Sequence, residues 1–208
     1  MSRRPTALVP TKPTPVPVKT PTRQAEELAG YLRAGPQVLG QFLEGKPRQT
    51  LDLAWVSLTS LIFPRIDLSG ALLVGTVFTD SDLNGSTFTA ADLRWLVGTG
   101  GKFRAAIFSG ADMRGTVLTG ADLTDAKFVG ADLTSAILNG ADVSGANFTG
   151  AICKGTYFIG VRGLEKASFE GAVLAGAYFS PGVDPEQFAQ RRGRVMVAAA
   201  EKTPHKRR

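Results

Sequence analysis

Large apolar residues recur every five positions through the middle of this chain, from Leu53 to Phe158. A smaller residue, most often alanine, stands two positions before most of them, as Ala121 stands before Leu123. A second period of twenty is visible in Phe88, Phe108, Phe128 and Phe148. A period of five fits neither the 3.6-residue helix nor the two-residue strand. The chain is therefore expected to turn a corner every five residues, and four such units complete one coil of a solenoid.

At each corner we expect the small and the large residue to point inward and the other three residues to face water. Two irregularities interrupt this pattern. Gly98 occupies a large-residue position without a change of phase, so the coil is expected to distort there without slipping. Between Val161 and Lys166 the phase slips by one residue, and it resumes at Phe169. That slip predicts a one-residue bulge, after which Phe169 rejoins the face of Phe148.

The five-residue unit reads alanine, aspartate or asparagine, a large apolar residue, a small polar or basic residue, and glycine. Clear examples are Ala111-Asp112-Met113-Arg114-Gly115 and Ala146-Asn147-Phe148-Thr149-Gly150. Residues 53–179, which hold some twenty units in one phase, resemble the pentapeptide-repeat family. The resemblance implies an all-β solenoid, a right-handed quadrilateral parallel β-helix with coils about 4.8 Å apart.

Composition outside the repeats predicts four segments. Residues 1–22 are a Pro-rich basic arm that cannot bury a core and should be extended chain. Residues 23–50 carry helical apolar spacing at Ala25, Leu28, Tyr31 and Leu32, and again over 38–43, with glycines after each run. These short helices are expected to cap the open strand edges of the first coil, and a dedicated binding helix is the alternative. Residues 51–183 form the β-helix. Residues 184–208 are a helix starting at Asp184-Pro185 and a basic tail.

The net charge of +6 is distributed unevenly along the 208 residues. Residues 51–183 carry nine Lys and Arg against twelve Asp and Glu, whereas residues 1–50 carry +5 and residues 184–208 carry +4. A mildly acidic rod therefore has a basic arm at each end. The arm residues predicted to bind a partner are Arg3, Arg4, Lys12, Lys19, Arg23, Arg191, Arg192, Arg194, Lys206, Arg207 and Arg208.

The residue just before each large apolar residue should face solvent. Aspartate dominates this position on two of the four faces of the expected rod. A third face carries an apolar series at the same position, namely Val77, Val97, Val117, Ile137, Tyr157 and Tyr178. We interpret this series as a contact surface, the alternative being that β-branched residues simply suit strands. Trp95 is also predicted to be exposed and to anchor a partner.

The sequence offers no set of residues for catalysis. Its only histidine, His205, lies in the basic tail, and no metal-spaced Cys/His cluster or phosphate loop is present. We therefore predict no enzymatic activity, no cofactor and no metal. Cys153 takes a large-residue position and is predicted to be buried and inert. The sequence contains no run of eighteen apolar residues and no signal-type apolar segment, which predicts a cytoplasmic bacterial protein. Because residues 1–25 lack acids and are rich in proline, threonine and basic residues, an organelle transit peptide is the minor alternative.

Three binding functions compete. The resemblance implies DNA mimicry, in which an acidic rod binds DNA gyrase and inhibits it or protects it from drugs, but a rod of only −3 with basic arms argues against it. Binding of nucleic acid by the arms is disfavoured because they carry few aromatic residues for stacking.

The preferred hypothesis is a structural linker, in which the rod and its arms dock into a large acidic assembly. Pentapeptide-repeat proteins abound in cyanobacteria, and basic linkers organise phycobilisomes. The specific hypothesis is therefore a light-harvesting antenna at the cytoplasmic face of a photosynthetic membrane. Pairing of two copies through the solenoid ends stays open.

Overall fold

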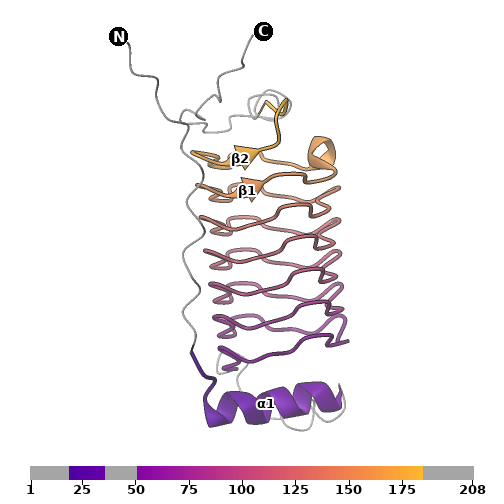
Figure 1. The fold of residues 1–208 in the computed structure, drawn as a ribbon, viewed down its shortest axis with the longest axis vertical. Helices are drawn as coiled ribbons and strands as arrows, with labels where there is room; N and C mark the ends of the chain where they lie inside the picture. The colour runs from indigo at the N-terminus through magenta and orange to yellow at the C-terminus, as the bar shows by residue number, and fades with distance from the viewer. Residues whose placement is uncertain (1–18, 36–50, 185–208) are drawn as a thin grey trace, which may run out of the picture.

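The computed structural model describes residues 19–35 and 51–184, which form a rod of stacked coils above one helix (Figure 1). The helix α1, Arg23–Ala34, lies across the base of the rod. Three short elements lie near the other end: the strand β1, Tyr157–Phe158, the 3-10 helix η2, Leu164–Lys166, and the strand β2, Tyr178–Phe179. Between α1 and β1, the coils are built from turns and single-residue parallel bridges.

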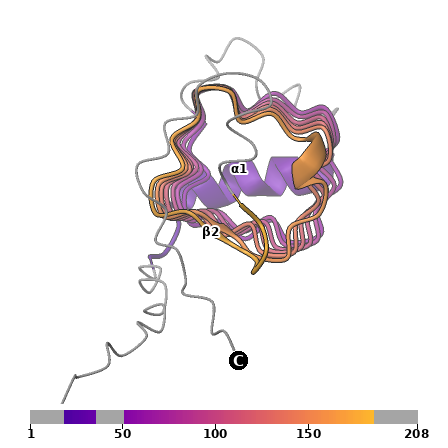
Figure 2. The ribbon, with the colours of Figure 1, turned by 90° about the horizontal axis from the view of Figure 1, so that it is seen from above.

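Each coil is held to the next by a ladder of backbone hydrogen bonds. The N–H of Val97 donates to the carbonyl of Thr76 at 2.9 Å, and the N–H of Gly98 donates to that of Val117 at 2.7 Å. Bridged residues lie twenty positions apart, so Val77, Val97 and Val117 stand directly above one another. Seen from above, the coils superpose around four sides (Figure 2). The predicted right-handed quadrilateral β-helix is confirmed.

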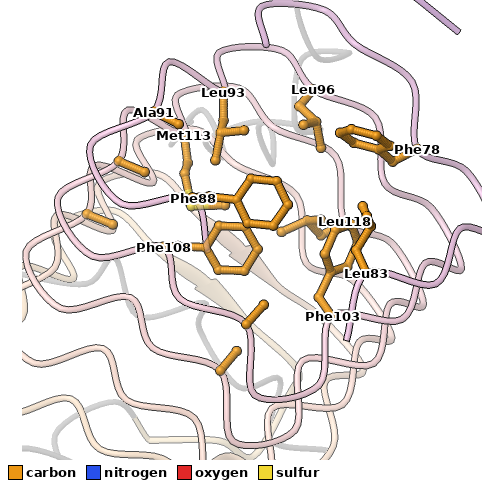
Figure 3. Close-up of a cluster of buried hydrophobic side chains, with 14 of the residues drawn as sticks. Phe78, Leu83, Phe88, Ala91, Leu93, Leu96, Phe103, Phe108, Met113 and Leu118 are labelled. Atoms are coloured by element: carbon orange, nitrogen blue, oxygen red, sulfur yellow. The ribbon is translucent and has the colours of Figure 1, made fainter. Parts of the chain in front are cut away.

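The interior is filled by the apolar residues that the five-residue period pointed inward (Figure 3). One column of phenylalanine rings stacks almost face to face at centroid distances of 4.6–5.0 Å. Its members are Phe88, Phe108, Phe128, Phe148 and Phe169. All five side chains are at most 2 % exposed. The inward register is therefore confirmed over the length of the rod.

The expectation that the coil distorts at Gly98 is wrong. The hydrogen bonds on both sides of Gly98 keep ordinary lengths, and Val97 bridges to Val77 and Val117. A Cβ at Gly98 would approach the Phe103 ring to 3.0 Å, and one at Gly101 would approach it to 2.6 Å. The Leu118 side chain and the Phe103 ring together occupy the space that a side chain at position 98 would need, so the coil keeps its path.

The phase slip is confirmed and takes the form of η2. Asp142 still bridges to Arg162, twenty residues on, whereas Asn147 bridges to Ser168, twenty-one residues on. Gly163, at φ 75°, leads into η2, and Leu164 is buried one residue later than the period requires. The extra residue is thus absorbed in one corner, and Phe169 still stacks on Phe148 at 4.7 Å.

The helix α1 closes the base of the rod. Its N-cap is Thr22, whose hydroxyl accepts from the N–H of Ala25 at 3.1 Å, and its C-cap is Gly35, which follows the last helical residue, Ala34. Ala25, Leu28, Ala29 and Leu32 are at most 4 % exposed and belong to the same core as the coils. The helix expected from this spacing is confirmed. The helices expected over residues 38–43 and from Asp184 onward lie outside the described residues.

Candidate docking surface

One side of the rod carries the apolar series as a single column. Six successive parallel pairings join Ser57, Val77, Val97, Val117, Ile137, Tyr157 and Tyr178. We call the last six residues the apolar stripe. Tyr178 is exposed and the other five side chains are half-buried. The rings of Tyr157 and Tyr178 stack at 4.5 Å, which extends the stripe to the upper end of the described rod.

A tryptophan pair borders the stripe at the preceding corner. Trp55 and Trp95 adopt left-handed backbone conformations there, with φ values of 66° and 56°. Their rings stack at 6.4 Å, and Trp95 lies so close to Gly115 that a Cβ on that glycine would come within 2.7 Å of it. Trp95 is consequently half-buried, and the expectation that it is exposed is wrong. Because Gly115 in the next coil has no side chain, the Trp95 indole packs against its backbone. The repeat pattern did not predict this contact.

Outward aspartates on three of the four faces accept hydrogen bonds from the turns. The Oδ1 atom of Asp132 accepts from the N–H of Thr134 at 2.9 Å, and the same contact two residues on recurs in most coils. Its other instances begin at Asp52, Asp67, Asp82, Asp92, Asp112, Asp122 and Asp142. These carboxylates accept hydrogen bonds from turn N–H groups that donate to no carbonyl of a neighbouring coil, as aspartate does in Asx turns.

Arginines neutralise part of the column that holds Asp92, Asp112 and Asp132. Arg94 binds Asp92 through two hydrogen bonds of 2.8 and 2.7 Å, and Arg114 binds Asp112 through two of 2.8 and 2.6 Å. Each guanidinium also approaches the aspartate of the next coil, at 3.8 Å for Arg94 and Asp112. On another face, Lys102 lies 3.9 Å from Asp82 and Arg162 lies 3.7 Å from Asp142. Basic side chains are therefore interspersed among the aspartates on both of these faces of the described coils.

Two carboxyl groups and one thiol have displaced pKa values. Burial raises the pKa of Asp112, but the hydrogen bonds from Arg114 outweigh it and hold the pKa below its usual value. Hydrogen bonds from Ser144 lower the pKa of Asp142. Burial raises the pKa of the Cys153 thiol to about 12, so the thiolate needed for reaction is scarce near neutral pH. Cys153 is fully buried, as expected from its position.

The predicted basic residues fall mostly beyond the described part of the chain. Lys19 and Arg23 are described and exposed, and Lys19 holds its ammonium 5.9 Å from the centre of the Trp55 ring. Arg3, Arg4, Lys12, Arg191, Arg192, Arg194, Lys206, Arg207 and Arg208 lie outside the described residues. Within residues 19–35 and 51–184, His, Cys, Asp and Glu form no group able to hold a metal ion. Across those same ranges, no helix has the length and apolarity needed to span a membrane.

The sequence matches the family model for pentapeptide repeats in eight copies, over residues 52–95, 102–134 and 126–162. The chain belongs to the pentapeptide-repeat family. A comparison with curated proteins found no match.

Among solved structures, pentapeptide-repeat proteins are the similar folds. A trypsin-treated variant of QnrB1, a plasmid-mediated fluoroquinolone resistance protein, has a TM-score of 0.54 at 20 % identity. That alignment covers 65 % of this chain and 74 % of QnrB1. HetL, involved in heterocyst differentiation regulation in the cyanobacterium Nostoc, is 20 % identical over 70 % of this chain and 97 % of its own, with a TM-score of 0.25. At 20 % identity the likeness to QnrB1 shows the fold alone.

Proposed function

We propose that this pentapeptide-repeat protein is a non-enzymatic linker that docks its rod and basic arms into a large acidic multi-subunit assembly. The observation that carries the proposal is the apolar stripe, because its residues stand in one continuous column on one face. The corresponding columns on the other faces are interrupted by charged or polar residues such as Asp112, Lys102 and Asn147. A surface with this distribution suits contact with a protein, whereas single exposed apolar residues would need no explanation.

The arrangement of charge supports a linker over a DNA mimic. A mimic must present carboxylates freely enough to replace phosphates. Here Asp92 and Asp112 are each bound by two arginine hydrogen bonds, and most outward aspartates accept from turn amides. The gyrase-binding function implied by the family resemblance is therefore the second candidate. The likeness of fold to QnrB1 does not distinguish the two functions, since it reflects the shared β-helix.

The partner that fits the basic arms carries net negative charge. Arms with +5 and +4 flank a rod of −3, so attraction to an acidic particle should depend on salt. A phycobilisome-type antenna at the cytoplasmic face of a photosynthetic membrane is our specific candidate for that particle.

The test compares sedimentation of the tagged chain from source cells with that of two double variants. Val117→Asp with Ile137→Asp places two charges on the stripe. Thr87→Asp with Ile107→Asp places two charges on the opposite face, also at half-buried bridge positions, and serves as the matched control. We expect the wild type and the control to migrate with a large particle at low salt and to leave it at high salt. The stripe variant should stay folded but migrate alone.

Equal migration of the stripe variant with the particle would remove the stripe from the proposed function. Recovery of the wild type with gyrase subunits alone would favour the DNA mimic. Mass spectrometry of the comigrating proteins distinguishes these outcomes and identifies the assembly.

A further inference from the structure

The tryptophan corner and the lower part of the apolar stripe lie side by side and form one largely apolar surface. Trp55 and Trp95 precede Ser57 and Val97 by two residues in their coils, so the tryptophans flank the lower part of the stripe. Above Trp95 the same corner holds Gly115, Ser135 and Gly155, and the Arg94 guanidinium lies 5.9 Å from the centre of the Trp95 ring. Both indoles are half-buried, and they are the chain's two tryptophans. The side of this corner that faces water therefore combines stacked aromatic faces with a row of β-branched and aromatic side chains.

The N-terminal part of the chain reaches this same corner. Residues 19–22 precede α1 and lie at the side of the rod's base (Figure 1, indigo). The Lys19 ammonium stands 5.9 Å from the centre of the Trp55 ring, within the range of a cation–π contact. Arg33, near the other end of α1, donates to the carbonyl of Ser57 at 2.6 Å, directly below the stripe. The eighteen residues before Lys19 are thus attached at the lower end of the apolar surface.

The composition of residues 1–18 suits that surface. They contain five prolines and the apolar residues Val9, Val16 and Val18, and they contain no acidic residue. Proline-rich segments adopt a preformed polyproline-II conformation and dock on grooves lined by aromatic side chains. Because this conformation is already restricted before binding, docking loses less entropy than ordering a flexible chain would.

The length of residues 1–18 is also sufficient. From the level of Trp55 to that of Tyr178 there are six coil steps, or about 29 Å at the usual strand spacing. Polyproline II rises about 3.1 Å per residue, so about nine residues cover this distance and eighteen cover about 56 Å. Attachment at Lys19 keeps the segment at an effective concentration near the millimolar range, well above that of a free competitor.

We propose that residues 1–18 dock along the tryptophan corner and apolar stripe of their own rod, as a polyproline-II strap that runs from Trp55 toward Tyr178. This inference goes beyond the proposed function, since it assumes nothing about a partner. It has one consequence for that function: a partner that binds the stripe has to displace the strap. Displacement would release Arg3, Arg4 and Lys12 for contact with an acidic partner.

Tryptophan fluorescence provides the first test, because both indoles lie on the proposed docking surface. The full chain is compared with a variant lacking residues 1–18 and with one in which residues 5–18 become Gly and Ser while Lys12 is kept. We expect both variants to show a red-shifted emission and stronger acrylamide quenching than the wild type. Circular dichroism and thermal unfolding confirm that the coils remain intact. Unchanged emission and quenching in both folded variants would overturn the proposal.

A spin label gives a second test that needs no deletion. Cys153 is fully buried, so a nitroxide reagent should modify only an introduced cysteine in Thr14→Cys. We expect paramagnetic broadening of the Trp95 indole N–H and the Val117 methyl groups, but not of Ile107, whose column lies on the opposite face. Equal broadening of all three, or none, would contradict docking on the stripe. Broadening that disappears on dilution would show that the segment binds a second copy, which would also overturn an intramolecular strap.

The two proposals fail separately. If the strap is absent, fluorescence and relaxation do not change, whatever the particle experiment shows. If the linker function is wrong, the stripe variant sediments with the particle as the wild type does, and the strap measurements on the purified chain are unaffected.

Discussion

At the scale of single residues, polar side chains in this rod complete the backbone's hydrogen bonding. Thr76, Thr116 and Thr156 stand where alanine is usual and are fully buried. Each hydroxyl donates to the carbonyl of a leucine twenty-three positions earlier, at 2.7–3.0 Å. These three buried hydroxyls are tolerated because they are paired, whereas the Ser86 hydroxyl, equally buried, has no hydrogen-bond partner among the described residues. The sequence pattern predicts only that these positions hold small residues, because the five-residue period depends on side-chain size and not on hydrogen bonding.

The Phe128 ring tests the inward register most directly. It is fully buried and stacks on Phe108 at 5.0 Å and on Phe148 at 4.6 Å. Phe128→Ala should lower the free energy of unfolding by about 3–5 kcal/mol, because it removes buried contact area and leaves a cavity. Denaturant unfolding measures the loss. The neighbouring Val129→Ala, at a side chain 39 % exposed, should cost less than about 0.5 kcal/mol. Equal stabilities of the two variants would contradict the register.

At the scale of elements, the two ends of the rod differ in how they are finished. The helix α1 covers the first coil with four buried side chains, whereas the other described end is formed by the paired strands β1 and β2 and the tyrosine stack. A parallel β-helix has open edges at both ends, and solenoids generally need capping elements to avoid edge-to-edge association. The position of α1 is consistent with that requirement.

Leu28 is the residue through which this cap can be tested. Leu28→Lys places a charge in the core, at a position where the side chain is only 4 % exposed. Burying a charged group without a partner of opposite charge is unfavourable. We expect α1 to detach, the midpoint of thermal unfolding to fall, and size-exclusion chromatography to show larger species formed through the uncovered first coil. Glu27→Lys, on the exposed side of the same helix, is the control and should remain unchanged. A monomeric Leu28→Lys of normal stability would exclude α1 as the cap.

At the scale of the whole molecule, charge is separated between the rod and its ends, yet much of the rod's charge is internally paired. Exposed ion pairs of this kind contribute little to stability individually. They do reduce the negative electrostatic potential around the rod, because Arg94, Arg114 and Arg162 lie beside the acidic columns. A partner therefore meets a rod of alternating charge with one apolar side.

The displaced carboxyl pKa values predict how the whole molecule responds to acid. The pKa values of Asp112 and Asp142 in the folded chain lie below the ordinary 3.8. Their ionised forms are stabilised by folding, so this stability is complete above about pH 4 and is lost as the pH falls through the folded-state values. The midpoint of thermal unfolding should change little from pH 7 to 5 and decline below about pH 4.

Asp142→Asn keeps an acceptor for the Ser144 N–H but removes the charge. It should lower stability at pH 7 by less than about 1 kcal/mol. Its decline in acid should be shallower than that of the wild type. A wild-type profile that rises on acidification would contradict the assigned direction.

Sequence periodicity predicted the fold because the solenoid repeats one local solution. Each five-residue unit needs a small and a large inward residue, so Phe88, Phe128 and Phe169 could be assigned to one buried column before any coordinates. The candidate site was predictable only in part. The alignment of Val97 with Val117 follows from the period of twenty, whereas the half-buried state of Trp95 depends on Gly115 in the next coil.

The sequence by itself determined the architecture, the inward register and the alignment of the apolar stripe, because all three depend on spacing along one chain. Only the tertiary structure decided how neighbouring coils share space. It showed that the ring of Phe103 fills the place left by Gly98, that Arg114 binds Asp112 with two hydrogen bonds, and that Lys19 reaches Trp55. These contacts depend on side-chain volume and direction between coils, which a one-dimensional period does not specify.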